Sequence, residues 1–144
     1  MKCKDVMSKN IKWASPESTI KEAVNIMEQE NCGAVPVVDQ NMRIKGIVTD
    51  RDITLFTILQ HKDPDTTQLK EFMSKDVITC LEEEDFHDLL TRMKEYQIRR
   101  IPIVNKENQL VGMVSLGDVA VKVPQEEHEA FEALERISEP VHTY

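Results

Sequence analysis

The chain contains two copies of one sequence pattern. A shift of 66 residues lays residues 6–53 on residues 72–119 without a gap. Positions that are identical in the two copies include Met7 and Met73, Pro36 and Pro102, Gly46 and Gly112, and Asp52 and Asp118. A unit of about 50 residues buries too little surface to be stably folded alone. We therefore expect the two copies to form one structural body.

Each copy has the same predicted order of strand, helix, strand, strand and helix. Apolar residues at helical spacing predict the first helix of each copy: Ile20, Ala23, Val24 and Met27, then Phe86, Leu89, Leu90 and Met93. Runs of β-branched residues at 35–38 and 44–48, and again at 101–104 and 110–114, predict a hairpin in each copy. Short leading strands are expected at 11–14 and 77–80. The fold class is therefore α/β (α+β), with two pseudo-symmetric repeats packed sheet to sheet.

Gly46 and Gly112 interrupt strands that otherwise carry bulky side chains. A glycine inside a strand favours a bulge or the close approach of another group. Pro36 and Pro102 cannot donate to a sheet ladder, so they are expected at a strand start or at a sheet edge. The same special residues thus recur at the same places in both copies.

The repeats divide the chain into a first repeat at 1–60, a linker at 61–71, a second repeat at 72–123 and an acidic C-terminal helix and tail at 124–144. In the last segment, Ala130, Phe131, Leu134 and Ile137 are spaced for one face of a helix. This face packs either on the chain's own repeats or across a dimer.

Composition excludes several classes of protein. The chain has 144 residues, of which 40% are hydrophobic and 31% charged, as in a folded protein. The net charge of −8 would repel a phosphate backbone, so no nucleic-acid partner is expected. No apolar run approaches the roughly 20 residues of a membrane span, and the first 20 residues do not resemble a signal peptide. We expect a cytoplasmic protein without a membrane partner.

The sequence lacks the motifs of several catalytic classes. The histidines form no His-Glu-x-x-His pattern, no serine lies in Gly-x-Ser-x-Gly, and four glycines are too few for a glycine-rich phosphate loop. We expect no enzyme, no metal and no cofactor. Cys3, Cys32 and Cys80 are widely spaced, and buried, reduced thiols are the expected state. A metal or redox sensor that uses Cys32 and Cys80 is a weaker alternative.

The most informative motif is Gly-x-x-[Thr/Ser]-x-x-Asp, which ends a predicted strand and opens a helix at 46–52 and at 112–118. Thr49 with Asp52, and Ser115 with Asp118, have the spacing of a capping box that closes the helix start. Alternatively, the hydroxyl and the free amides face a phosphate, while the carboxylate accepts two hydrogen bonds from the paired hydroxyls of a ribose. The residues alone leave both readings open.

The run before each repeated proline differs between the copies. It is Cys-Gly-Ala-Val at 32–35 but Ile-Arg-Arg-Ile at 98–101. Arg99 and Arg100 are adjacent arginines in an acidic chain, and guanidinium groups suit phosphate oxygens. The alternative is an ordinary solvated pair, which could for example face the acidic run at 82–84.

With these motifs in place, residues 6–119 resemble a tandem pair of cystathionine β-synthase (CBS) domains, a Bateman module. The segment Val-Thr-x-Arg-Asp at 48–52 is similar to segments of free-standing bacterial CBS pairs and of the regulatory inserts of inosine monophosphate dehydrogenases. The resemblance implies two repeats about a pseudo-twofold axis, with clefts that commonly bind adenine nucleotides. It also implies a homodimer, in which two modules form a flat disk, and a protein partner that receives the signal.

The resemblance also implies the site residues. Asp52 and Asp118 would hold ribose hydroxyls, and Thr49 and Ser115 would lie beside ribose or phosphate; Arg51 belongs to the same segment. The adenine would be framed by Ile11, Ala34 and Pro36 in the first repeat and by Val77, Arg100 and Pro102 in the second. Arg99 and Arg100 would meet a phosphate in the Asp52 cleft. The equivalent residues Gly33 and Ala34 carry no charge, so the Asp52 cleft is expected to be the better site.

The function that follows is a regulatory module that senses AMP, ADP or ATP, with S-adenosylmethionine as a further candidate. The nucleotide would be a regulatory ligand and not a cofactor. The alternative is a ligand-free dimerisation or interaction scaffold, in which the repeated hydroxyl and carboxylate pairs act only as helix caps.

Overall fold

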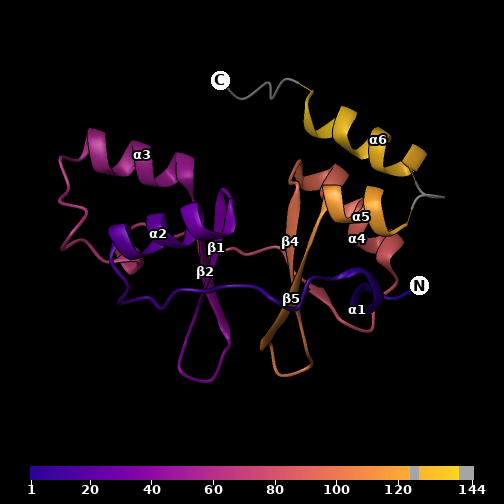
Figure 1. The fold of residues 1–144 in the computed structure, drawn as a ribbon, viewed down its shortest axis with the longest axis horizontal. Helices are drawn as coiled ribbons and strands as arrows, with labels where there is room; N and C mark the ends of the chain where they lie inside the picture. Colours follow the sequence, from indigo (N-terminus) through magenta and orange to yellow (C-terminus); the bar gives the residue numbers. More distant parts are fainter. Residues whose placement is uncertain (124–126, 140–144) are drawn as a thin grey trace. The chain divides into compact units, whose positions relative to one another are not determined.

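The structure is a computed structural model and describes residues 1–123 and 127–139. The chain forms two compact units. Residues 11–77 and 107–110 form the first, which we call the N-repeat unit. Residues 1–10, 78–106 and the described residues from 111 onward form the second, the C-repeat unit. Each unit has its own helices, sheet and apolar core (Figure 1).

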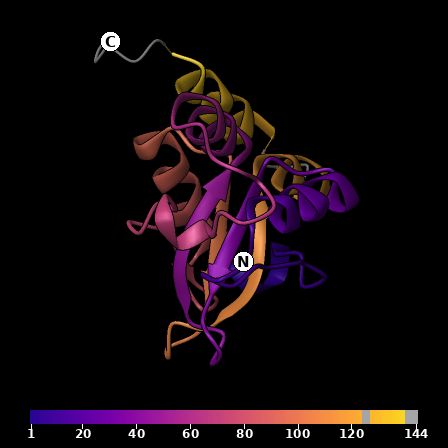
Figure 2. The same cartoon turned by 90° about the vertical axis from the view of Figure 1, so that its left-hand side faces the viewer.

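The N-repeat unit contains α2 (Ile20–Glu30), β1 (Ala34–Val38), β2 (Ile44–Thr49), α3 (Asp50–Leu59) and the short 3₁₀ helix η1 (Leu69–Glu71). Strands β1 and β2 pair antiparallel, with Ala34 opposite Thr49, and Figure 2 shows them side by side. Helix α2 begins at a capping box between Thr19 and Glu22. Ile20 of α2, Val35 of β1 and Leu69 of η1 are fully buried in the core. The predicted helix and hairpin are confirmed.

The predicted leading strand at 11–14 is wrong. Only Ala14 joins the sheet, through a single bridge in which its amide bonds Pro36 O at 3.0 Å and its carbonyl accepts from Val38 N at 2.9 Å. Lys12 and Trp13 are exposed, so the segment touches the core through one residue and forms no longer ladder. The strand expected at 77–80 is likewise displaced, because β3 covers only Cys80–Leu81.

The C-repeat unit contains α1 (Cys3–Val6), β3 (Cys80–Leu81), α4 (Phe86–Tyr96), β4 (Arg100–Val104), β5 (Leu110–Ser115), α5 (Leu116–Lys122) and α6 (Glu127–Ile137). Its sheet has the order β3-β4-β5, and β3 runs parallel to β4. The second predicted helix and hairpin are confirmed by α4, β4 and β5. Cys3, from the start of the chain, is fully buried in the same core as the middle of α4.

Gly46 and Gly112 lie where another segment of the same unit approaches the strand, as the sequence predicted. The strand pairing also shifts register beside Gly46, between the pairs Val37–Gly46 and Val38–Ile44, so at Gly46 both sequence expectations are confirmed. A Cβ on Gly46 would lie 2.7 Å from Met73 Sδ, and a Cβ on Gly112 would lie 2.5 Å from Met7 Sδ. Ser74 pairs with the neighbour of Gly46 on β2, and Ser8 pairs in the same way on β5. The repeated Met-Ser segments are therefore exchanged: the first segment lies in the C-repeat unit and the second in the N-repeat unit.

Helix α6 packs on α4 and α5 of its own unit (Figure 1), as in the first of the two alternatives left by the sequence. The predicted contact face is partly wrong. Ala130 and Ala133 are buried, whereas Phe131 is 67% exposed. Alanines let two helices approach closely, so the small residues form the contact. Neither α6 nor any other described helix is long and apolar enough to span a membrane.

Candidate nucleotide site

The first candidate site lies where β2 ends and α3 begins. Asp52 N donates to Thr49 Oγ1 at 3.1 Å, and Thr49 N donates to Asp52 Oδ2 at 3.2 Å. Both residues are half-buried. The capping box that the sequence predicted is formed. The second carboxylate oxygen of Asp52, Oδ1, has no hydrogen-bond partner among residues 1–123 and 127–139.

The second candidate site repeats this arrangement where β5 ends and α5 begins. Asp118 N donates to Ser115 Oγ, and Ser115 N donates to Asp118 Oδ2, both at 3.0 Å. Asp118 Oδ1 also has no hydrogen-bond partner within the described part of the chain. In both sites, one carboxylate oxygen closes the helix and the other can accept a bond from a ligand.

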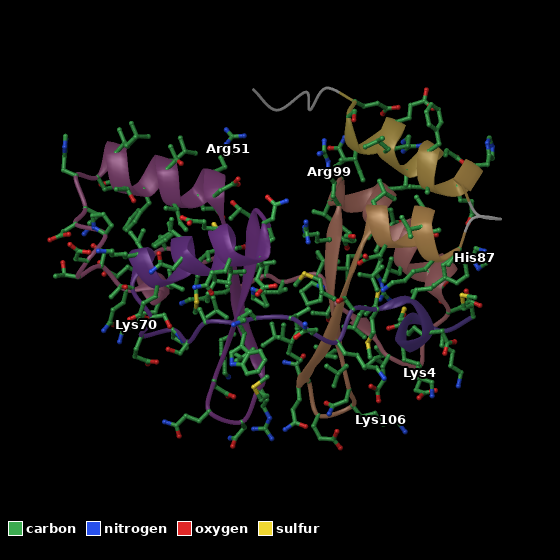
Figure 3. All side chains as sticks on the ribbon, in the orientation of Figure 1. Lys4, Arg51, Lys70, His87, Arg99 and Lys106 are labelled. Carbon is green, nitrogen blue, oxygen red and sulfur yellow. The ribbon has the colours of Figure 1, made fainter. Side chains whose placement is uncertain are left out.

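The remaining predicted residues of the first repeat are only partly gathered around Asp52. Ala34 is paired with Thr49 across the hairpin, and Asp50 N donates to the carbonyl of Gly33 at 3.0 Å. Arg51 is exposed and extends outward from the first turn of α3 (Figure 3). Pro36 is buried further along β1, opposite Ile47. Ile11 is half-buried outside any regular element.

A cavity of about 840 Å³ lies in the C-repeat unit beside Ser115. Its lining residues are Arg99, Arg100, Ser115, Leu116, Gly117, Ala120, His128, Ala130, Phe131 and Leu134. Leu116 N donates to the carbonyl of Arg99 at 2.9 Å, which ties the start of α5 to the residue before β4. Pro102 is buried within β4, and Val77 belongs to the other unit. The cavity therefore gathers three of the predicted site residues: Arg99, Arg100 and Ser115.

The two arginines are placed to meet an anion. Figure 3 shows Arg99 at the start of β4, beside α6. Among the residues that the structure describes, neither Arg99 nor Arg100 forms an ion pair. Across the described residues, no ion pair joins them to the acidic run at 82–84, so the pairing suggested for a solvated pair is not formed. The solvated pair itself remains the alternative to a phosphate role. Glu83 is held by Lys2 and Lys4, whose hydrogen bonds lower its pKa to about 2, and Glu84 is held by Arg92.

The cysteine that lies next to Cys80 is Cys3, and not Cys32 as the metal or redox alternative required. The thiol of Cys3 hydrogen-bonds to Cys80, which lowers the pKa of Cys80 and raises that of Cys3. Cys32 instead donates to the carbonyl of Ala34 at 3.5 Å. All three cysteines are free thiols, and Cys3 and Cys80 are buried. No group of three or more His, Cys, Asp or Glu residues in the described ranges is placed to hold a metal ion.

Comparison with known proteins explains the repeated architecture. The family model for the CBS domain matches residues 3–57 and again residues 69–125. The chain belongs to the CBS domain family. Over 118 residues it is 44% identical to CBS domain-containing protein YhcV of Bacillus subtilis, a match that covers 82% of each protein. The two family matches cover both repeats, including both capping boxes and both Met-Ser segments.

Two solved CBS structures are also similar. Hypoxic Response Protein I, described with two coordinated zinc ions, matches with a TM-score of 0.79 and 27% identity, over 86% of this chain and all of that one. The CBS domain pair of protein MJ0100, described in complex with 5′-methylthioadenosine and S-adenosyl-L-methionine, matches with a TM-score of 0.75 and 28% identity. That match covers 88% of this chain and 98% of the other.

Proposed function

We propose that this CBS pair is a cytoplasmic, non-catalytic regulatory module that binds an adenine nucleotide. AMP, ADP, ATP and S-adenosylmethionine are the candidate ligands. The observation that carries the proposal is the cavity at Ser115, which combines a mostly apolar lining with two arginines. Its volume of about 840 Å³ lies within the range of small-molecule sites, which are apolar with a few polar groups that fix the orientation of the ligand. The adenosine ligands of the similar MJ0100 pair support the ligand class.

The chemistry of the cavity suits the three parts of a nucleotide. Apolar side chains accept a purine base, and guanidinium groups bind phosphate oxygens in a bidentate manner. In our proposal, Arg99 and Arg100 bind the phosphate. Asp118 binds the ribose through the oxygen that the capping box does not use. Asp118 itself is not among the lining residues, but its capping partner Ser115 is.

The first repeat offers a second, less complete set of the same groups. Thr49 and Asp52 form the same junction as Ser115 and Asp118, and Asp52 Oδ1 is equally available. The sequence-based expectation that the Asp52 site binds more tightly depended on Arg99 and Arg100 reaching that site from the other repeat. Both arginines line the cavity at Ser115, so which site binds more tightly is a question for experiment. Calorimetry with Asp52→Ala and Asp118→Ala tests it, because each substitution removes one of the two ribose acceptors. Equal losses of affinity in the two variants would contradict a preference for the Asp52 site.

Binding would regulate by changing which arrangement of the module is favoured. A ligand can move a conformational equilibrium only by its difference in affinity for the two states. We therefore propose a homodimer whose arrangement depends on the bound nucleotide, and a protein partner that recognises one arrangement.

A thermal-shift panel of AMP, ADP, ATP, GTP and S-adenosylmethionine on the purified chain tests the proposal. A ligand at 100 times its dissociation constant stabilises the folded state by about 2.7 kcal/mol, which gives a measurable rise in melting temperature. We expect at least one adenine ligand to raise the melting temperature and GTP to have a smaller effect. No shift with any adenine ligand would contradict the proposal.

A ligand-free scaffold is the second candidate, and the two complete capping boxes favour it. Both carboxylates already stabilise a helix start, so their presence in both repeats does not by itself require a ligand. A scaffold predicts that Asp52→Ala lowers the melting temperature of the free protein and that no nucleotide raises it.

A further inference from the structure

One wall of the cavity at Ser115 comes from outside the part of the chain that the CBS family model matches. That match ends at residue 125, whereas α6 begins at Glu127. Helix α6 nevertheless contributes His128, Ala130, Phe131 and Leu134 to the lining. The cavity is therefore a joint product of the second repeat and of the segment that follows it.

Helix α6 is held in place without a ligand. Ala130 and Ala133 are buried among α4 and α5. Two polar contacts also reach α4 and the residue that follows it: Lys94 Nζ lies 3.8 Å from Glu132 Oε2, and Gln97 Nε2 donates to the carbonyl of Arg136 at 3.0 Å. The buried contact leaves Phe131 67% exposed on the cavity side of α6. The Phe131 ring is therefore accessible to a ligand in the cavity.

Another part of the lining is cationic. Arg99 and Arg100 precede and begin β4, and the hydrogen bond from Leu116 N to Arg99 O fixes the backbone there. A ligand that satisfies both parts needs a flat apolar group for Phe131 and an anionic group for the arginines. A nucleoside phosphate has both, because bases stack on aromatic side chains and phosphate suits guanidinium groups.

We propose that α6 is part of the nucleotide site of the second repeat, where Phe131 contacts the base while Arg99 and Arg100 bind the phosphate. The inference rests on the proposed function and adds to it that the bound nucleotide further stabilises the contact of α6 with the C-repeat unit. The N-repeat unit, in which every residue is described, has only η1 after α3 and no helix equivalent to α6. The two repeats therefore differ, and only the second couples its ligand to a helix outside the family match.

Titration calorimetry with AMP compares the full chain with Phe131→Ala. In Phe131→Ala, we expect the dissociation constant of the site in the second repeat to rise about 10- to 100-fold, because base stacking is lost. The melting temperature of the free protein should stay unchanged, since the ring is mostly exposed. Val121→Ala is the matched control, because Val121 is 78% exposed on α5 and does not line the cavity. This control should bind AMP like the original chain.

Amide hydrogen exchange of α6 provides a second readout. AMP should slow exchange at 127–137 in the original chain and not in Phe131→Ala. If AMP binds both proteins equally well, the role of α6 is wrong while the proposed function stands. If S-adenosylmethionine binds and AMP does not, the inference alone fails. If no adenine ligand binds the original chain, the proposed function fails together with the inference.

Discussion

Arg92 donates a hydrogen bond from Nη1 to Cys80 Sγ over 2.8 Å, while its Nη2 lies 2.8 Å from Glu84 Oε2. One guanidinium group on α4 thus contacts both a buried thiol and a partly buried carboxylate. We expect Arg92→Met to lower the free energy of unfolding by about 1–3 kcal/mol, because both groups lose a charged hydrogen-bond partner. Urea denaturation measures the change.

The control for that substitution is Arg136→Met. Arg136 lies 3.8 Å from Glu139, and both side chains are more than half exposed. Exposed ion pairs contribute little to stability, so this variant should unfold close to the original chain. Equal losses in the two variants would contradict a specific role for the contact between Arg92 and Cys80.

The three thiols should react at different rates. Cys32 is half-buried, whereas Cys3 and Cys80 are buried next to each other in the C-repeat unit. We expect one thiol to react rapidly with a disulfide reagent in the native protein and the other two only as the protein unfolds. Cys32→Ser should remove the rapid phase. A rapid phase that persists in this variant would show that the start of the chain opens readily.

Asp52→Ala should weaken AMP binding about 10- to 150-fold if the carboxylate holds the ribose, because hydrogen bonds to a charged group contribute roughly 1.5–3 kcal/mol. Glu22→Ala is a matched control. Glu22 closes the equivalent capping box at α2, where its carboxylate accepts from Thr19 N at 3.3 Å. Both variants should lose similar stability, and only Asp52→Ala should lose affinity. Unchanged affinity in Asp52→Ala would contradict the ribose role.

Gly112→Ala should lower the free energy of unfolding by about 1–3 kcal/mol, since a methyl group there would meet Met7 Sδ at 2.5 Å and Ser8 O at 3.0 Å. Gly117→Ala is the control, and it should raise the free energy of unfolding. The nearest atom to its new Cβ would be 3.8 Å away, and alanine favours the helix by roughly 0.5–1 kcal/mol. Thermal or urea unfolding distinguishes the two signs. A neutral Gly112→Ala would mean that the Met7 segment moves aside easily.

A homodimer should depend on the exposed apolar side chains of the N-repeat unit. Leu55, Ile58 and Leu59 of α3 and Val24 of α2 are exposed, which is a typical feature of an interaction surface. We expect Ile58→Asp to shift the chain from dimer to monomer in light scattering coupled to size-exclusion chromatography. Tyr96→Asp, on the exposed surface of α4, should leave the dimer intact. A monomeric original chain would contradict the expectation.

The sequence predicted those parts of the fold that depend on neighbouring residues. Apolar periodicity located α2 and α4, and β-branched runs located the two hairpins. The spacing of Thr49 and Asp52 predicted a capping box, which the structure contains. These features arise from backbone geometry within a few residues, so one sequence is enough to recognise them.

Contacts between distant segments could not be predicted in the same way. The spacing of the cysteines could not indicate that Cys80 lies beside Cys3, because that contact depends on which unit receives the start of the chain. In α6 the larger apolar residues suggested the wrong face. Ala133 is fully buried because its small side chain allows close helix packing, while Phe131 lines a cavity that sequence alone could not reveal.

The exchange of the Met-Ser segments means that no single cut can separate this protein into two complete halves. Cleavage before η1 would leave the N-repeat unit without Leu69 and Ser74, and would leave the C-repeat unit without residues 1–10. Each fragment would carry the piece that its counterpart needs. The chain should therefore recover its structure from such fragments only when both are mixed, as in fragment complementation.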